Sequence, residues 1–196
     1  FEIHLRIISS GKSKKLSKDE CLKIKIRLTK ALQTYIFADK DITLQESVVN
    51  LLKKKKYTIS FAESCTGGLI SNLITNVPGS SSVFGLGLVT YSNKSKNSLL
   101  KVSNKKLIEH GAVSKEVVSE MVRNLNKIAD SNISVAVSGI AGPSGGSVDK
   151  PVGTVYVSFI IDKKISVKKY SFVGDRESIK LRTALEVLNH VRKNIL

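Results

Sequence analysis

The sequence has no tryptophan, one methionine and only two cysteines among its 196 residues. Cys21 and Cys65 lie far apart without a repeated spacing, so neither a disulfide framework nor a cysteine-rich zinc site is indicated. No apolar run approaches the roughly 20 residues that a membrane-spanning helix needs. The first residues also lack a signal-peptide pattern. We therefore expect a cytoplasmic, globular protein with reduced thiols and no membrane association.

Acidic residues are scarce, with 16 Asp and Glu against 32 Lys and Arg, and the resulting net charge of +16 allows nucleic acid or another polyanion as a partner. The excess lysines are scattered along the chain, however, and only residues 53–56 form a cluster. That cluster ends a helical pattern, where cations complement the helix dipole. A phosphate-binding patch is the alternative interpretation.

At 196 residues, of which 41% are hydrophobic, the chain is long enough for one well-buried α/β domain and a small appendage. Because it opens on Phe1 without an initiator methionine, we interpret it as a fragment of a longer polypeptide. Residues 3–8 are strand-like, and an amphipathic helix pattern follows a predicted cap at Ser17. These patterns predict half of a small α+β module over residues 1–42. A second capping box at residues 43–46 opens the main domain, residues 43–196.

Strand and helix patterns alternate from residue 57 onward. Strands are predicted at residues 58–62, 85–91 and 133–137, and a hairpin at residues 152–161 and 165–172, turning at residues 162–164. Helices are predicted at residues 67–75, 93–101, 114–129 and 175–195. The alternation predicts an α/β fold, a three-layer α/β/α sandwich with a mixed sheet, preceded by the small α+β segment.

Three segments interrupt the regular patterns directly after strands. They are residues 63–68 (ESCTGG), 90–96 (TYSNKSK) and 138–146 (SGIAGPSGG). In α/β proteins, ligands bind at the carboxyl ends of strands, so we expect the functional site here.

Ser64 stands at the first of these strand-to-helix turns. Backbone N–H groups and the positive end of a helix would favour both an exposed hydroxyl and a developing oxyanion there. The alternative is that Ser64 and Thr66 cap the helix while Gly67 and Gly68 permit close packing. The local pattern fits both interpretations equally well.

A serine nucleophile needs a base, and the usual base is nearly absent. The three histidines, His4, His110 and His190, fall in a strand pattern, at a helix end and in the last helix, which disfavours a Ser-His-Asp triad. Lysine and tyrosine remain as candidates.

Lys96 follows the Tyr91 strand by about one helical turn, where burial and nearby positive charge would lower its pKa and leave it able to accept a proton. Spacing alone does not distinguish it from Lys94 and Lys101, because any lysine in such a chain is usually a solvated surface group.

The third segment, residues 138–146, predicts a glycine-rich loop whose backbone N–H groups can approach an anion or a carbonyl oxygen. It lacks the glycine-lysine-serine ending of a loop that binds a nucleoside triphosphate. The sequence also has no pair of acidic residues that indicates bound magnesium. A simple turn is an equally good interpretation.

Seven blocks of the sequence, taken in order, resemble the C-terminal domain of the CinA (competence/damage-inducible) family, which is shared with stand-alone nicotinamide-nucleotide amidases. The blocks are residues 62–68, 77–80, 89–93 with Lys96, 111–114, 138–143, 150–155 and 174–177. The resemblance runs from about Leu44 to the C-terminus. Residues 1–42 resemble part of the KH-like connector that precedes this domain in full-length CinA.

The resemblance implies that Ser64 is the nucleophile, Lys96 its general base and Tyr91 an assisting hydroxyl. The substrate-binding residues would be Thr66, Gly67, Gly68, Ser138, Gly139, Ala141, Gly142 and Arg176. Arg176 would approach the 5′-phosphate, for which its planar charged fork is suited. The implied reaction is hydrolysis of the carboxamide of nicotinamide mononucleotide, without a metal or other cofactor. We also expect a homo-oligomer.

Two other functions fit parts of the sequence. One is a non-catalytic binding or oligomerisation module of a CinA protein, against which the joint presence of Ser64, Tyr91 and Lys96 argues. The other is a nucleic-acid-associated competence protein. Against it, residues 1–40 contain no Gly-x-x-Gly clamp, and aromatic residues make up only 6% of the chain, too few for extensive base stacking.

Overall fold

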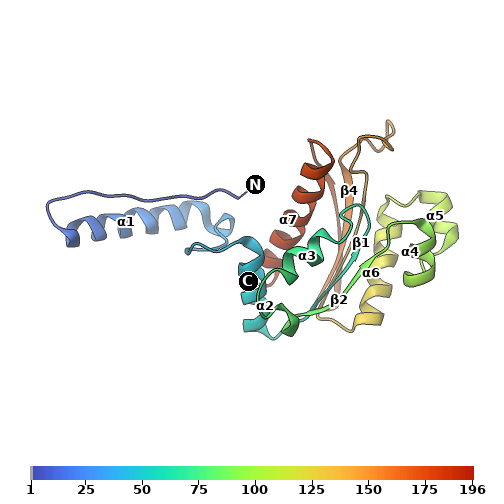
Figure 1. The fold of residues 1–196 in the computed structure, drawn as a ribbon, viewed down its shortest axis with the longest axis horizontal. Coiled ribbons are helices and arrows are strands. Elements are labelled where there is room, and N and C mark those ends of the chain that lie inside the picture. Colours follow the sequence, from blue (N-terminus) through green and yellow to red (C-terminus); the bar gives the residue numbers. More distant parts are fainter. Residues whose placement is uncertain (1) are drawn as a thin grey trace. The chain divides into compact units, whose positions relative to one another are not determined.

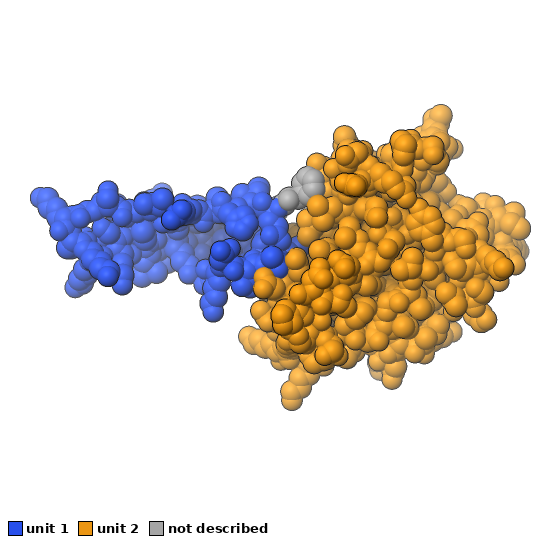
Figure 2. Space-filling view, in the orientation of Figure 1, with its two compact units in different colours: residues 1–44 blue, residues 45–196 orange. Residues whose placement is uncertain are grey.

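The computed structural model describes residues 2–196 and divides them into two compact units, one ending at Leu44 and the other beginning at Gln45 (Figure 2). The first unit contains helix α1 (Lys14–Leu32) and a short 3-10 helix η1 (Gln33–Tyr35). The predicted helix is therefore confirmed, but its cap is Ser13, whose hydroxyl accepts a hydrogen bond from the Leu16 N–H, and not Ser17.

The predicted strand at residues 3–8 is wrong. Residues 2–11 have no regular secondary structure, and the Ser9 hydroxyl donates to the Glu20 carboxylate of α1 at 2.8 Å. A strand needs a second strand to satisfy its backbone groups, and the described part of this unit contains none. The unit is consequently helical instead of α+β, and α1 has no buried residue.

The second unit is a three-layer sandwich (Figure 1), as the sequence predicts. Its strands are β1 (Ile59–Glu63), β2 (Phe84–Val89), β3 (Ile133–Gly139), β4 (Thr154–Ile161) and β5 (Lys164–Ser171). Its helices are α2 (Leu44–Lys55), α3 (Leu69–Thr75), η2 (Ser80–Ser82), α4 (Asn93–Leu100), α5 (Asn104–His110), α6 (Lys115–Ala129) and α7 (Arg176–Asn194). Helices α2, α3 and α7 lie on one side of the sheet and α4, α5 and α6 on the other.

The sheet is mixed, with strand order β2-β1-β3-β4-β5. Strand β1 runs parallel to β2 and β3, whereas β3, β4 and β5 are antiparallel. Every residue of β1 is buried, because helices cover both faces of this central strand. Ala62 and Ala136 are paired in register and are part of the core that α6 covers with Val118, Met121 and Val122.

Two details differ from the sequence prediction. Helix α5 was not predicted, because it is short and buries only Leu107, so its hydrophobic periodicity is weak. The predicted hairpin is confirmed, but Lys164 already belongs to β5. Asp162 and Lys163 alone form the turn and both have positive φ, as a two-residue hairpin turn that follows the strand twist requires.

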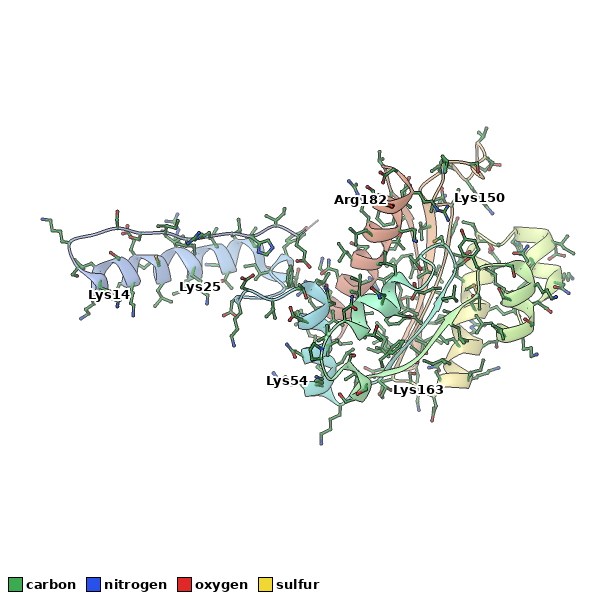
Figure 3. All side chains as sticks on the ribbon, in the orientation of Figure 1. Lys14, Lys25, Lys54, Lys150, Lys163 and Arg182 are labelled. Carbon is green, nitrogen blue, oxygen red and sulfur yellow. The ribbon has the colours of Figure 1, made fainter. Side chains whose placement is uncertain are left out.

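Basic side chains project from many different segments. Figure 3 labels Lys14 and Lys25 on α1, Lys54 on α2, Lys150 before β4, Lys163 in the hairpin turn and Arg182 on α7. This distribution agrees with the scattered lysines of the sequence.

Gly153 holds the glycine-rich loop against the sheet. Its N–H donates to the Ile140 carbonyl at 2.8 Å and its carbonyl accepts from the Phe172 N–H at 3.0 Å, with φ of +91°. A Cβ at this position would overlap the Phe172 carbonyl oxygen.

We therefore expect Gly153→Ala to lower the free energy of unfolding by about 3 kcal/mol or more, measured by denaturant titration. Gly145→Ala is the matched control, since Gly145 also has positive φ, at +88°, but its Cβ would meet only Ile140 Cγ2 at 3.8 Å. The control should lose only the roughly 1–2 kcal/mol of left-handed backbone strain. Equal losses in the two variants would show that steric overlap at Gly153 is not decisive.

Candidate active site

The carboxyl ends of the three parallel strands are tied together around Ser64. The Ser64 N–H donates to the Val137 carbonyl of β3 at 3.0 Å, and the Thr90 N–H donates to the Glu63 carbonyl at 2.8 Å. The three segments that the sequence singles out therefore leave the sheet at the same edge. Ser64 itself is buried, with 7% of its surface exposed.

Lys96 is the buried base candidate beside Ser64. Its Nζ lies 2.8 Å from Ser64 Oγ, 2.8 Å from the Thr90 carbonyl oxygen and 3.3 Å from the Tyr91 carbonyl oxygen. Only 1% of its surface is exposed, whereas Lys94 and Lys101 are exposed. The structure thus makes the selection among the three lysines that spacing could not make.

Burial brings the neutral form of the Lys96 amine within reach near neutral pH. Burial lowers the pKa of Lys96 from about 10.5 to about 8. Among the described residues no cation adds to this lowering, so the expected contribution of positive charge is not seen in the chain itself. Because carbonyl oxygens only accept hydrogen bonds, a neutral amine donates its two N–H groups to Thr90 and Tyr91. In the structure the amine is placed to donate to Ser64 Oγ as well; in the neutral form its lone pair would take that direction and accept from the Ser64 hydroxyl.

The neighbouring thiol is not a competing nucleophile. Cys65 is buried, and burial raises its pKa to about 12. A thiol with this pKa stays protonated at neutral pH, whereas the reactive form of cysteine is the thiolate. The Ser64 hydroxyl is therefore the candidate reactive group of the segment.

Glu63 holds the loop that carries Ser64. Its carboxylate is fully buried; Oε2 accepts from the N–H groups of Gly68 and Ile70 at 3.0 and 3.1 Å, and Oε1 from the N–H and hydroxyl of Ser71 at 2.8 and 2.7 Å. A carboxylate here satisfies the free N–H groups of α3 and complements its dipole. Ser64 consequently does not cap the helix, which excludes the capping interpretation for this residue, whereas its role as nucleophile stays a prediction.

Sequence reasoning assigned no role to Glu63. The signal was available, because an acidic residue between a buried strand and the start of a helix is placed to complement the helix N-terminus. Gly67 and Gly68 lie between β1 and α3 and adopt φ of +64° and +94°, respectively. These positive values allow the chain to turn back over the Glu63 carboxylate.

Backbone N–H groups next to Ser64 are candidate donors to an oxyanion. Within residues 2–196, the N–H groups of Cys65 and Thr66 donate to no backbone carbonyl; both lie against the Cys65 thiol, a weak acceptor. The Thr66 hydroxyl is also buried and has no hydrogen-bond partner among the described residues. This turn therefore offers polar groups to a substrate beside the nucleophile.

Tyr91 and Arg176 form a second cluster. The exposed Tyr91 hydroxyl accepts from Arg176 Nη2 at 2.6 Å, and Arg176 Nη1 donates to the Gly142 carbonyl at 2.8 Å. Tyr91 contacts the Ser64–Lys96 pair through its backbone carbonyl, and its hydroxyl is bonded to Arg176 instead. The structure thus joins Tyr91, Gly142 and Arg176, which the sequence places far apart.

Ser138 and the glycines after it have structural contacts of their own. The Ser138 hydroxyl donates to the Ala112 carbonyl at 2.8 Å. A Cβ on Gly139 would lie 2.7 Å from Val155 Cγ2, so this glycine is needed for close packing on β4. Ala141 is buried. Contact of Ser138, Gly139 and Ala141 with a substrate stays a prediction.

Among the described residues, neither His110 nor His190 forms a hydrogen bond with Ser64 or Lys96. His190 packs on the Phe159 ring, with ring centroids 4.1 Å apart, and His110 ends α5. In residues 2–196 no group of three or more His, Cys, Asp and Glu side chains is arranged to hold a metal ion. The described part of the chain also contains no helix that is long and apolar enough to cross a membrane.

Comparisons with known proteins show which family the chain is related to. A CinA-like protein of Thermotoga neapolitana is 47% identical over 161 residues, covering 82% of this chain and 39% of that protein. A relative named as competence-damage inducible, from Caldanaerobacter subterraneus subsp. tengcongensis, is 43% identical over 191 residues, covering 97% of this chain and 46% of that protein. The chain thus spans less than half of the length of these relatives.

A solved structure agrees with the fold. The competence/damage inducible protein CihA from Agrobacterium tumefaciens has a TM-score of 0.71 at 33% identity, covering 78% of this chain and 96% of that chain. The sequence model of the CinA C-terminal domain matches residues 41–195. On this match and these identities, the chain belongs to the CinA family and contains its C-terminal domain.

Proposed function

We propose that the chain is an amidase that hydrolyses the carboxamide of nicotinamide mononucleotide to nicotinic acid mononucleotide and ammonia. The observation that carries the proposal is the 2.8 Å distance between Ser64 Oγ and the Nζ of buried Lys96. A serine in contact with a basic amine is a known arrangement for amide hydrolysis. The family resemblance supports the choice of substrate.

In the acylation step, Ser64 Oγ attacks the carboxamide carbon while its proton passes to the neutral Lys96 amine. The oxygen of the tetrahedral intermediate accepts hydrogen bonds from the N–H groups of Cys65 and Thr66, and such donors are typically worth about 3 kcal/mol of barrier each. Protonated Lys96 then gives its proton to the departing amino group. Ammonia leaves, and the acyl group remains on Ser64 as an ester.

In the deacylation step, water attacks the ester carbonyl and Lys96 accepts the proton of the water. The ester bond breaks, Ser64 recovers its hydroxyl proton from Lys96, and nicotinic acid mononucleotide leaves. The positive pyridinium of the substrate withdraws electrons from the carbonyl carbon and assists attack in both steps. It also adds the positive charge near Lys96 that the described residues do not supply, which favours the neutral amine.

A non-catalytic module explains Lys96 poorly. Burying an amine away from water is costly unless the amine is paired or neutral, and Lys96 contacts only a hydroxyl and two carbonyl oxygens. Buried groups with strongly shifted pKa values gather at functional sites. This favours catalysis over a binding or oligomerisation role.

The Ser64→Ala variant should lose at least about three orders of magnitude in turnover, because it lacks the attacking atom and loses little packing volume. Ammonia release and formation of the acid mononucleotide measure the effect, and circular dichroism checks the fold. Cys65→Ala is the control and should keep most of the activity. If Ser64→Ala retains more than about a tenth of the rate, the serine mechanism is wrong.

Activity should depend on the neutral form of Lys96. Since its pKa lies at about 8, the rate should rise as the pH rises through that value and level off above it. Lys96→Arg should be nearly as inactive as Lys96→Ala, because arginine keeps the charge but does not release a proton near neutrality. A pH–rate profile of all three proteins is the measurement, and substantial activity in the arginine variant would exclude Lys96 as the base.

Arg176→Ala should weaken binding of nicotinamide mononucleotide by about tenfold or more, while binding of the phosphate-free riboside changes little. The reason is that a guanidinium–phosphate contact has no partner in the riboside. KM values for the two substrates provide the comparison, with Arg123→Ala on α6 as a charge-matched control. Equal losses on both substrates would assign Arg176 a structural role through Tyr91 and Gly142.

A further inference from the structure

Lys180 places a second cation next to the nucleophile loop. Its Nζ is the atom nearest to the position that a Cβ on Gly67 would occupy, at 3.9 Å. Gly67 is three residues beyond Ser64, in the turn between β1 and α3, and α3 packs against α7, which carries Lys180. The ammonium group therefore lies over the loop that holds the nucleophile.

This ammonium group has no partner within the described part of the chain, where Lys180 forms neither an ion pair nor a hydrogen bond. Glu177, three residues before Lys180 on α7, is exposed and forms no ion pair with it within the described residues. Two other acidic side chains, at the end of β1 and at the start of α7, are engaged elsewhere. Glu63 is bonded to the start of α3, and Asp175 accepts from the Ser178 N–H at 2.8 Å. Lys180 is partly buried.

Arg176 lies four residues before Lys180, so the two side chains share one face of α7. Arg176 points to Tyr91 and Gly142, and Lys180 points to Gly67. The first half of α7 thus faces all three loops of the site with two cations.

We propose that Lys180 is a specificity-determining residue, which together with Arg176 binds the phosphate of the substrate. A phosphate monoester carries a charge of about −1.5 to −2 at neutral pH, which one arginine does not neutralise. Two of the five N–H groups of Arg176 are used by Tyr91 and Gly142, whereas all three of Lys180 are unused. The pair therefore selects a phosphorylated pyridine riboside over the riboside and the free amide. This inference rests on the proposed function.

Binding should be measured by calorimetry on the Ser64→Ala chain, so that turnover does not interfere. Adding Lys180→Ala should weaken the binding of nicotinamide mononucleotide by about tenfold and change the affinity for the riboside by no more than about twofold. Lys180→Arg, which keeps the charge, should restore most of the affinity. Lys127→Ala on α6 removes the same charge from the other face of the sheet and should change the affinity for neither ligand.

Combining Lys180→Ala with Arg176→Ala should give a loss of affinity that is not the product of the two single losses, because both cations contact one group.

Equal weakening of mononucleotide and riboside by Lys180→Ala would overturn the inference and assign Lys180 to the carboxamide end of the site. If the loss of affinity in the double variant equals the product of the two single losses, Lys180 and Arg176 do not contact the same phosphate, and the inference is also overturned. If the parent chain binds no mononucleotide, the proposed function fails separately. Titration with inorganic phosphate then tests the two cations directly: binding that weakens with Lys180→Ala supports the anion site, and unchanged or absent binding refutes it.

Discussion

The contact between Lys96 and Ser64 depends on what surrounds the lysine amine. Two carbonyl oxygens, from Thr90 and Tyr91, lie 2.8 and 3.3 Å from Nζ, and neither can donate a hydrogen bond. A neutral amine between them therefore has one direction left for its lone pair, toward the Ser64 hydroxyl. Burial supplies the second condition, because it disfavours the charged amine and lowers the lysine pKa. The position of the two carbonyl oxygens and the burial of the amine thus both act on Lys96 Nζ.

The sheet keeps this contact in register. Ser64 follows β1, and the two carbonyls come from residues 90 and 91, directly after the neighbouring strand β2. Hydrogen bonds from Ser64 to Val137 and from Thr90 to Glu63 join the ends of β1, β2 and β3. The Glu63 carboxylate then holds the start of α3, so the nucleophile loop is restrained on both sides. A shift in any of these connections would move the serine away from the amine.

Helix α7 gives the site its charge. Its first residue, Arg176, joins the loops of Tyr91 and Gly142, and Lys180 extends toward Gly67. The reacting pair itself carries little net charge when the lysine is neutral. In the proposed function, the strand ends therefore carry the chemistry and the last helix carries the recognition of the anion.

The alternation of strand and helix patterns was enough to predict the three-layer sandwich, because buried central strands and amphipathic helices are local properties of the chain. Ser64, Lys96 and Arg176 were also named as site candidates, through their blocks of family resemblance. Spacing alone did not separate Lys96 from Lys94 and Lys101, and the sequence showed neither the Glu63 cap nor the position of Lys180. Those depend on contacts between residues far apart in the chain. Burial of one amine, and the direction of its lone pair, exist only once the strands have paired and the helices have covered them.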